Sequence, residues 1–145
     1  MNSKPYVQLK ERQQKEFNEF PIAYAFSDQQ LEEALKKLQA TKDEVVTVFN
    51  HGDIVKKENA PKLLEMMRRH DKEVEEAMKD EEFAEGAFLY EMNNHEYCIN
   101  WSADEDVLGC FMLDFKKLKE RGLEDAYRRA RNEHMRLAHE EWEII

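Results

Sequence analysis

Hydrophobic residues recur at helical spacing along most of the chain. The clearest case follows Ser27, where one apolar helix face consists of Leu31, Ala34, Leu35 and Leu38. Ser27 and Gln30 have the spacing of a capping box, which marks a helix start. Stripes of the same kind predict further helices over residues 5–20, 59–79, 81–93, 102–109, 112–119 and 123–139. A break of the helix over 59–79 near His70 and Asp71 is an alternative.

Four short segments have the pattern of strands. Residues 22–26 are continuously apolar and aromatic, which favours a buried strand. Residues 44–49 are rich in β-branched side chains, and residues 54–57 follow a turn sequence centred on Gly52. Together they predict a hairpin near 44–57, and residues 97–99 add a fourth short strand. The expected fold class is therefore α+β, mainly helical, with a small sheet of three to four short strands.

The chain shows no sign of division into domains. It has 145 residues, and no internal repeat or linker rich in glycine, proline or serine interrupts it. A length of this order fits one hydrophobic core. We therefore expect a single α+β domain over residues 1–145.

The formal net charge of -10 limits the partners that the chain can bind. Binding to phosphates needs a basic face, so we expect no direct contact with nucleic acid and no membrane surface as a partner. No apolar run approaches the roughly 20 residues of a membrane span, and the first residues lack the apolar core of a signal peptide. These features predict a cytoplasmic protein in which Cys98 and Cys110 are free, buried thiols.

The charges are unevenly distributed along the sequence. Residues 71–96 contain ten acidic and two basic residues, whereas residues 115–139 contain eight basic and four acidic residues. One interpretation is two solvated helix faces that face one another. The other is an acidic surface that a basic partner recognises, with electrostatics setting the rate of encounter.

The densest aromatic stretch, residues 83–101, contains a polar segment from Asn93 to Glu96. Asn93 or Asn94 can adopt the left-handed conformation that ends a helix. Our interpretation is that the polar side chains of this segment are locked inside the fold, where they satisfy backbone groups. The alternative is a ligand-binding site under the hairpin, formed by Asn94, His95, Glu96 and Tyr97.

No set of residues has the pattern of a metal or catalytic site. His95 and Cys98 have metal-ligand spacing, but a structural zinc site normally shows a second pair downstream. We therefore expect no metal and no cofactor. His95 and Cys98 are also a poor nucleophile and base, because side chains three residues apart on an extended segment point to opposite faces. The sequence thus favours a protein without catalytic residues.

Three blocks of the sequence keep a common order: FPIAYAFSDQQLEEALKKL, RRHDKEVEEAM and FLYEMNNHEYCIN. They resemble an uncharacterised family of small bacterial proteins from gut Firmicutes and mobile elements. The stretch from Tyr90 to Asn100 is similar to its Tyr-Glu-Leu-x-Asn-His-Glu-Tyr pattern. The resemblance implies that residues 94–97 are characteristic of the family, but it implies no activity. The hairpin departs from the family, because relatives tend to be rich in glycine before an Ile-Arg-Lys segment.

Together these features predict a non-enzymatic binding or regulatory protein of a bacterium or its mobile element. We expect it to act through a protein partner. The alternative is a small-ligand binder or a hydrolase-like enzyme that uses His95, Glu96 and Tyr97. The chain ends in a segment with three large apolar residues, Trp142, Ile144 and Ile145. We therefore also consider a homodimer through the C-terminal helix and tail, or docking of the tail onto its own fold.

Overall fold

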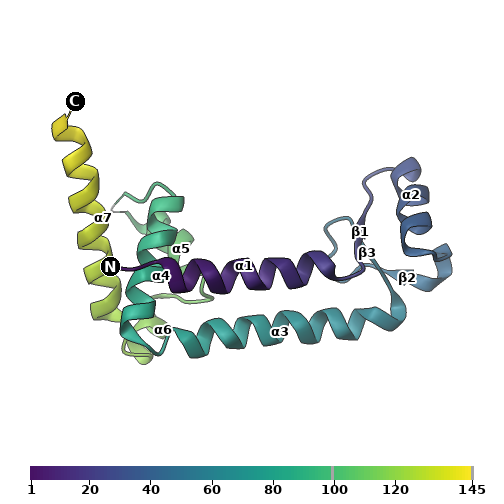
Figure 1. Cartoon of the computed structure of the whole chain (residues 1–145), viewed down its shortest axis with the longest axis horizontal. Helices are drawn as coiled ribbons and strands as arrows, with labels where there is room; N and C mark the ends of the chain where they lie inside the picture. The colour runs from purple at the N-terminus through teal and green to yellow at the C-terminus, as the bar shows by residue number, and fades with distance from the viewer. Residues whose placement is uncertain (99, 145) are drawn as a thin grey trace. The chain divides into compact units, whose positions relative to one another are not determined.

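The computed structural model describes residues 1–98 and 100–144, with side chains from residue 141 onward excluded. The helices are α1 Lys4–Glu19, α2 Asp28–Leu38, α3 Ala60–Ala77, α4 Glu81–Asn94, α5 Trp101–Gly109, α6 Phe115–Glu120 and α7 Glu124–Ile144. The strands are β1 Ala23–Tyr24, β2 Val45–Val46 and β3 Asp53–Lys56, and short 3₁₀ turns span Lys42–Glu44 and Lys57–Asn59 (Figure 1). The expected fold class, mainly helical α+β with a small sheet, is confirmed.

The chain folds into two compact units. The first, which we call the helical unit, combines residues 1–11 with residues 72–145, and the second, the sheet unit, spans residues 12–71. The boundary falls within α1 and within α3, so each of these helices contributes to both units. The assignment of residues 1–145 to one domain stays a prediction.

The sheet unit is built around three antiparallel strands in the order β1-β3-β2. Val46 of β2 pairs with Val55 of β3, which confirms the hairpin expected near 44–57. One cluster of buried residues joins the sheet to α2 and consists of Ala23, Ala34, Leu38 and Ile54. Another joins it to α3 and consists of Ile22, Val55, Leu63 and Met66. Neighbouring strand residues thus alternate between two helical layers, as side chains on a pleated strand must.

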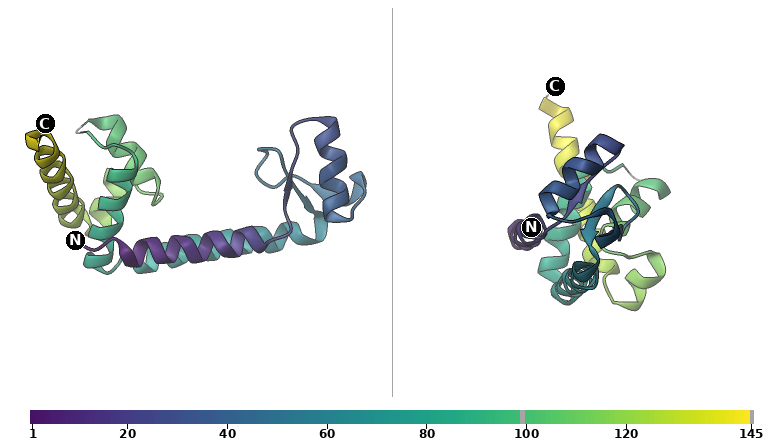
Figure 2. Two further views of the ribbon diagram at one scale, coloured as in Figure 1. Left: turned by 45° about the horizontal axis from the view of Figure 1, so that its top comes forward. Right: turned by 90° about the vertical axis from the view of Figure 1, so that its right-hand side faces the viewer.

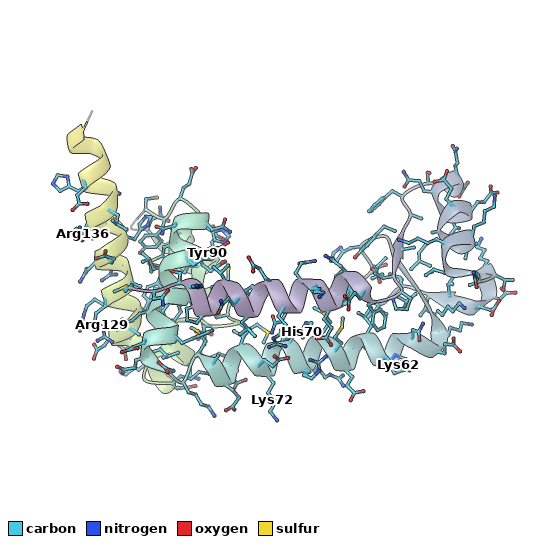
Figure 3. The ribbon with its side chains drawn as sticks, in the orientation of Figure 1. Lys62, His70, Lys72, Tyr90, Arg129 and Arg136 are labelled. Atoms are coloured by element: carbon cyan, nitrogen blue, oxygen red, sulfur yellow. The ribbon has the colours of Figure 1, made fainter. Side chains whose placement is uncertain are left out.

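Within the sheet unit, the later part of α1 lies against the earlier part of α3 (Figures 2 and 3). The side-chain amide of Gln13 donates a buried hydrogen bond of 3.0 Å to the carbonyl oxygen of His70. The His70 ring is itself buried, and its Nε2 atom lies 3.0 Å from Oε2 of Glu16. The alternative of a helix break at His70 is wrong, because His70 continues the buried face of Leu63 and Met66.

Two predicted helix starts are confirmed in detail. The Ser27 hydroxyl accepts a hydrogen bond of 3.2 Å from the N–H of Gln30. In return, the side-chain oxygen of Gln30 accepts a hydrogen bond from the N–H of Phe26. The carboxylate of Asp80 caps α4 by accepting from the N–H groups of Glu82 and Phe83. Such caps satisfy the first N–H groups of a helix, which have no partner within it.

The core of the helical unit surrounds Phe88 of α4, which is fully buried. Its ring meets the rings of Phe111 and Tyr127 edge to face, each at a centroid distance of 5.1 Å. Gly86, also on α4, has the backbone of Asn2 where a side chain would stand. Helices α4 and α7 lie side by side in this unit (Figure 1).

Three local expectations differ from the structure. Helix α4 ends with Glu96 in the left-handed region, at a φ of 50°, and not with an asparagine. Helix α5 begins at Trp101, one residue before the predicted start, and its cap is Asn100, whose side chain accepts a hydrogen bond of 2.8 Å from the N–H of Ala103. Residues 97 and 98 form no strand, and Ile99 lies outside the described residues.

The C-terminal helix extends beyond the predicted end at residue 139, to Ile144. The expected docking of the tail concerns side chains that lie outside the described residues, so it stays a prediction. In the part of the chain that the structure describes, no helix combines the length and the apolar character needed to cross a membrane.

Candidate functional site

The segment from Asn94 to Tyr97 ends α4 in a Schellman motif. Glu96 is left-handed, and the N–H of Tyr97 donates a hydrogen bond of 2.9 Å to the carbonyl of Met92. Asn94, His95 and Glu96 are exposed, whereas Tyr97 is buried. The expectation that these polar side chains are locked inside the fold is therefore wrong for the first three. The backbone closes the helix by itself and does not need them.

The buried end of this segment is the hydroxyl of Tyr97. It donates a hydrogen bond of 2.7 Å to Oδ1 of Asp104 on α5, and the hydroxyl of Tyr127 on α7 donates to the same atom at 2.5 Å. Burial and the Asp104 carboxylate raise the pKa of Tyr97 to about 12 and raise the pKa of Tyr127 as well. A hydroxyl held in this way is a structural group and is poorly placed to reach a ligand.

His134 on α7 completes the buried network. Its Nε2 atom lies 2.9 Å from the carbonyl oxygen of Tyr97, and its Nδ1 atom lies 2.6 Å from the side chain of Asn93. Sequence analysis did not single out His134 or Asp104. Both carry a readable signal, because each polar residue interrupts an otherwise apolar helix face, near Tyr127 and Val107 respectively.

His95 lies in a cluster with Glu91 and Cys110. Its Nε2 atom is 3.3 Å from Sγ of Cys110 and 3.5 Å from Oε2 of Glu91, and the three potential ligand atoms lie within 4.8 Å of one another. Glu91 is buried, and Tyr6 forms a hydrogen bond with its carboxylate. The sulfur of Cys110 also lies 3.3 Å from the carbonyl oxygen of Asp106.

The geometry of this cluster does not suit thiol catalysis. In a catalytic triad the imidazole uses one nitrogen for the nucleophile and the other for the orienting carboxylate. Here Nε2 of His95 faces both Cys110 and Glu91. Partial burial of the thiol, followed by the hydrogen bond and charge of Glu91, raises the pKa of Cys110 to about 12, whereas a nucleophilic cysteine needs a lowered pKa.

The two cysteines are free, as expected, but the expectation that they are buried is wrong, because both residues are exposed. Cys98 is not paired with His95 in the way that their spacing allowed. Its sulfur accepts a hydrogen bond of 3.0 Å from the side chain of Asn100, next to the start of α5.

Basic side chains of α7 and the preceding turn pair with the acidic stretch in the helical unit. Arg129, labelled on α7 in Figure 3, bonds to Glu85 and lies 3.4 Å from a carboxylate oxygen of Glu81. Arg121 lies 3.9 Å from Glu75. These contacts support the interpretation of two charged faces that face one another. Part of the charge of residues 71–96 is neutralised within the unit.

The sheet unit has an exposed aromatic edge. Strand β1 is at the end of the strand order, and 49% of Tyr24 and 76% of Phe26 remain exposed. The expectation that residues 22–26 are all buried is wrong, because an edge strand has no neighbour to cover it. A groove of about 430 Å³ runs beside this edge and is lined by Ala23, Tyr24, Phe26, Gln30, Glu33, Ala34 and Lys37. We call it the edge groove.

The hairpin turn fixes the position of Phe26. Gly52 has a φ of 82°, and a Cβ atom at this position would overlap the Phe26 ring. The N–H of Ala25 donates a hydrogen bond of 2.9 Å to the carbonyl of Gly52, which extends the pairing of β1 with β3. Gly52 is thus required by packing within the sheet unit. The predicted ligand site of Asn94, His95, Glu96 and Tyr97 with the hairpin stays a prediction.

Comparison with known protein families gives a match over most of the chain. The profile of a family of unknown function, DUF7659, matches residues 5–133. No curated protein and no solved structure matches the chain. The matched range contains the edge groove, the hydrogen-bonded residues Tyr97, Asp104 and Tyr127, and the cluster of Glu91, His95 and Cys110, whereas His134 lies just beyond it.

Proposed function

The chain belongs to DUF7659, a family of unknown function, and from this premise we propose that it binds a protein partner and performs no reaction. The observation that carries this proposal is the edge groove with its two exposed aromatic side chains, Tyr24 and Phe26. Exposed aromatic residues at a concave surface are typical of protein interfaces. The partner in this proposal contributes an extended segment that adds a strand to β1.

The backbone of β1 supports addition of a strand. Ala23 pairs with Ile54, and the N–H of Ala25 donates to Gly52. Because inward and outward groups alternate along an antiparallel strand, the N–H and C=O of Tyr24 point away from β3 toward the open edge. An incoming strand forms two backbone hydrogen bonds with Tyr24, and its alternate side chains enter the edge groove.

The side chains of the groove indicate the chemistry of the segment. Tyr24 and Phe26 supply apolar area, while Glu33 and Lys37 carry opposite charges. We therefore expect an uncharged segment with apolar or aromatic side chains at alternate positions. The Phe26 ring is held against Gly52 before binding, which reduces the entropy lost on association.

The test uses photo-crosslinking from position 26 in the full chain, followed by identification of the crosslinked protein. Tyr24→Pro removes the outward N–H and leaves the pairing of Ala23 and Ala25 with β3 intact, since proline is tolerated at such edge positions. We expect Tyr24→Pro to abolish the crosslink and Tyr24→Phe to preserve it. Trp101→Ser, which changes an exposed aromatic residue of the helical unit, is the matched control.

Two results would refute the proposal. One is a crosslink that persists in Tyr24→Pro, because strand addition cannot then be the mode of binding. The other is a crosslink that Trp101→Ser abolishes, because the partner then depends on the helical unit. Circular dichroism of each variant separates loss of binding from loss of fold.

The other features expected from the sequence remain part of this proposal. A cytoplasmic location, an origin in a bacterium or its mobile element, and a homodimer through α7 and the tail rest on sequence patterns. The alternative of a small-ligand binder or hydrolase-like enzyme has less support, because Asp104 holds the Tyr97 hydroxyl in the core. The side chains of His95 and Glu96 are exposed and are not held in the core in this way.

A further inference from the structure

Three different metal-binding side chains converge at the end of α4. Glu91 and His95 lie one helical turn apart on α4, and Cys110 follows the last residue of α5. Residues four positions apart share a helix face, so the carboxylate and the imidazole point the same way. From this convergence we propose that Glu91, His95 and Cys110 bind a zinc ion.

The distances agree with a tetrahedral zinc site. Zinc bonds of about 2.0–2.3 Å place neighbouring ligand atoms about 3.3–3.6 Å apart. The contacts of Nε2 of His95, 3.3 Å to the sulfur and 3.5 Å to the carboxylate oxygen, fall within this range. Nε2 of His95 faces both Cys110 and Glu91. This arrangement argues against a catalytic triad, but it is the one that a shared metal ion requires.

The ligand set selects zinc over the common hard cations. Thiolate, imidazole and carboxylate are together ligands of zinc, whereas calcium and magnesium prefer oxygen alone. The carboxylate of Glu91 and the thiolate of Cys110 supply two negative charges, and neutral His95 adds none. On binding, the Cys110 thiol releases its proton to solvent, so the charge of Zn²⁺ is balanced.

The surrounding fold holds two of the three ligands. Tyr6, which is buried on α1, forms a hydrogen bond with the Glu91 carboxylate, as residues around metal ligands commonly do. The N–H of Cys110 donates a hydrogen bond of 3.2 Å to the carbonyl oxygen of Val107, and this bond fixes the turn that follows α5. Three protein ligands leave the fourth position to water or to a group from another molecule, and His95 lies at the exposed side.

The test uses untagged protein that has been freed of metal with a chelator and is then titrated with Co²⁺ as a spectroscopic probe. We expect one Co²⁺ per chain, with the thiolate-to-cobalt charge-transfer absorption of a bound cysteine. Zn²⁺ should displace the cobalt and remove this absorption. The chain offers a matched control, because Cys98 is a second exposed cysteine outside the cluster.

Each variant gives a distinct expected result. Cys98→Ser should keep the absorption, and Cys110→Ser should lose it. His95→Gln and Glu91→Gln should each weaken Zn²⁺ binding by at least about tenfold. Loss of a residue that only hydrogen-bonds to a metal ligand already lowers metal affinity by about this factor. Tyr6→Phe should weaken binding to a smaller extent, while Tyr90→Phe, the neighbouring exposed tyrosine, should have no effect.

The proposal is overturned if the wild-type protein binds neither Co²⁺ nor Zn²⁺ at one equivalent. It is also overturned if the charge-transfer absorption survives in Cys110→Ser or disappears in Cys98→Ser. Far-UV circular dichroism of every variant checks that the fold is retained. None of these variants changes a residue of the edge groove. The result of the metal titration is therefore independent of the proposed partner binding.

Discussion

Nε2 of His134 lies 2.9 Å from the carbonyl oxygen of Tyr97, and the two rings meet edge to face with their centroids 5.7 Å apart. Since a carbonyl oxygen only accepts hydrogen bonds, this nitrogen carries the proton. The contact joins α7 to the turn that ends α4, across 37 residues of sequence. The histidine that stabilises this turn is therefore His134, whereas His95 faces the surface.

His134→Ala should lower the free energy of unfolding by about 1–3 kcal/mol, because the buried carbonyl of Tyr97 and the side chain of Asn93 lose their partner. His95→Ala should change it by less than about 1 kcal/mol in metal-free protein, since His95 is exposed. Urea denaturation followed by circular dichroism measures both. Equal losses in the two variants would contradict the assignment of the structural role to His134.

Asp104→Ala should cost about 2–3 kcal/mol of stability, because two buried tyrosine hydroxyls lose the acceptor that they share. The control is Asp106→Ala, an exposed residue on the same helix. In addition, Asp104→Ala combined with Tyr127→Phe should recover part of the loss, since one unsatisfied hydroxyl is removed. A double variant no more stable than Asp104→Ala would speak against the network.

Asp53→Asn should destabilise the protein at neutral pH by about 2 kcal/mol, because the buried carboxylate accepts several hydrogen bonds from residues 47–51. Burial alone would raise the pKa of Asp53, but the N–H groups of Phe49, Val48 and His51, with the Thr47 hydroxyl, outweigh it and lower the pKa to about 2.

The pH dependence of this effect has a defined sign. A carboxyl whose pKa is lowered on folding stabilises the protein above its unfolded value, here 3.8. That contribution is lost as the pH falls through the folded value of about 2. The difference in unfolding free energy between wild type and Asp53→Asn should therefore shrink between pH 4 and pH 2. A constant difference over this range would show that the charge of Asp53 does not contribute.

Gly52→Ala should destabilise the sheet unit by about 1–2 kcal/mol, since its φ of 82° is unfavourable for a residue with a Cβ atom. The added methyl group would also overlap the Phe26 ring. Phe26→Ala should remove this second cost, so the effect of Gly52→Ala should be smaller in that background. Thermal denaturation of the four proteins gives the coupling, and strict additivity would show that the ring is not constrained by Gly52.

The local signals of the sequence predict much of the fold. The cap at Ser27, the helical period after it and the turn at Gly52 are each encoded within a few residues. By contrast, the end of α4 depends on contacts that are distant in sequence. Tyr97 is buried in the core, and Glu96, the residue before it, adopts the left-handed conformation that ends the helix. The two compact units are not visible in the sequence, because their boundary lies inside continuous helices and not in a linker.

The candidate sites were less accessible from the sequence. His95 was identified, but its partner Cys110 lies 15 residues away, just after α5, so spacing pointed to Cys98 instead. The exposure of Phe26 depends on the position of β1 in the strand order, which an apolar run does not specify. Asp104 and His134 are polar residues on otherwise apolar helix faces. A polar residue in such a position is a sequence signal of a buried hydrogen bond.

The carboxylate of Asp53 accepts hydrogen bonds from three N–H groups of its own loop, those of Val48, Phe49 and His51. Exchange of these three amide hydrogens with heavy water consequently requires a common opening, the detachment of one side chain. Their protection factors should be similar and should fall together in acid, so that a loop of irregular backbone exchanges as a single cooperative unit.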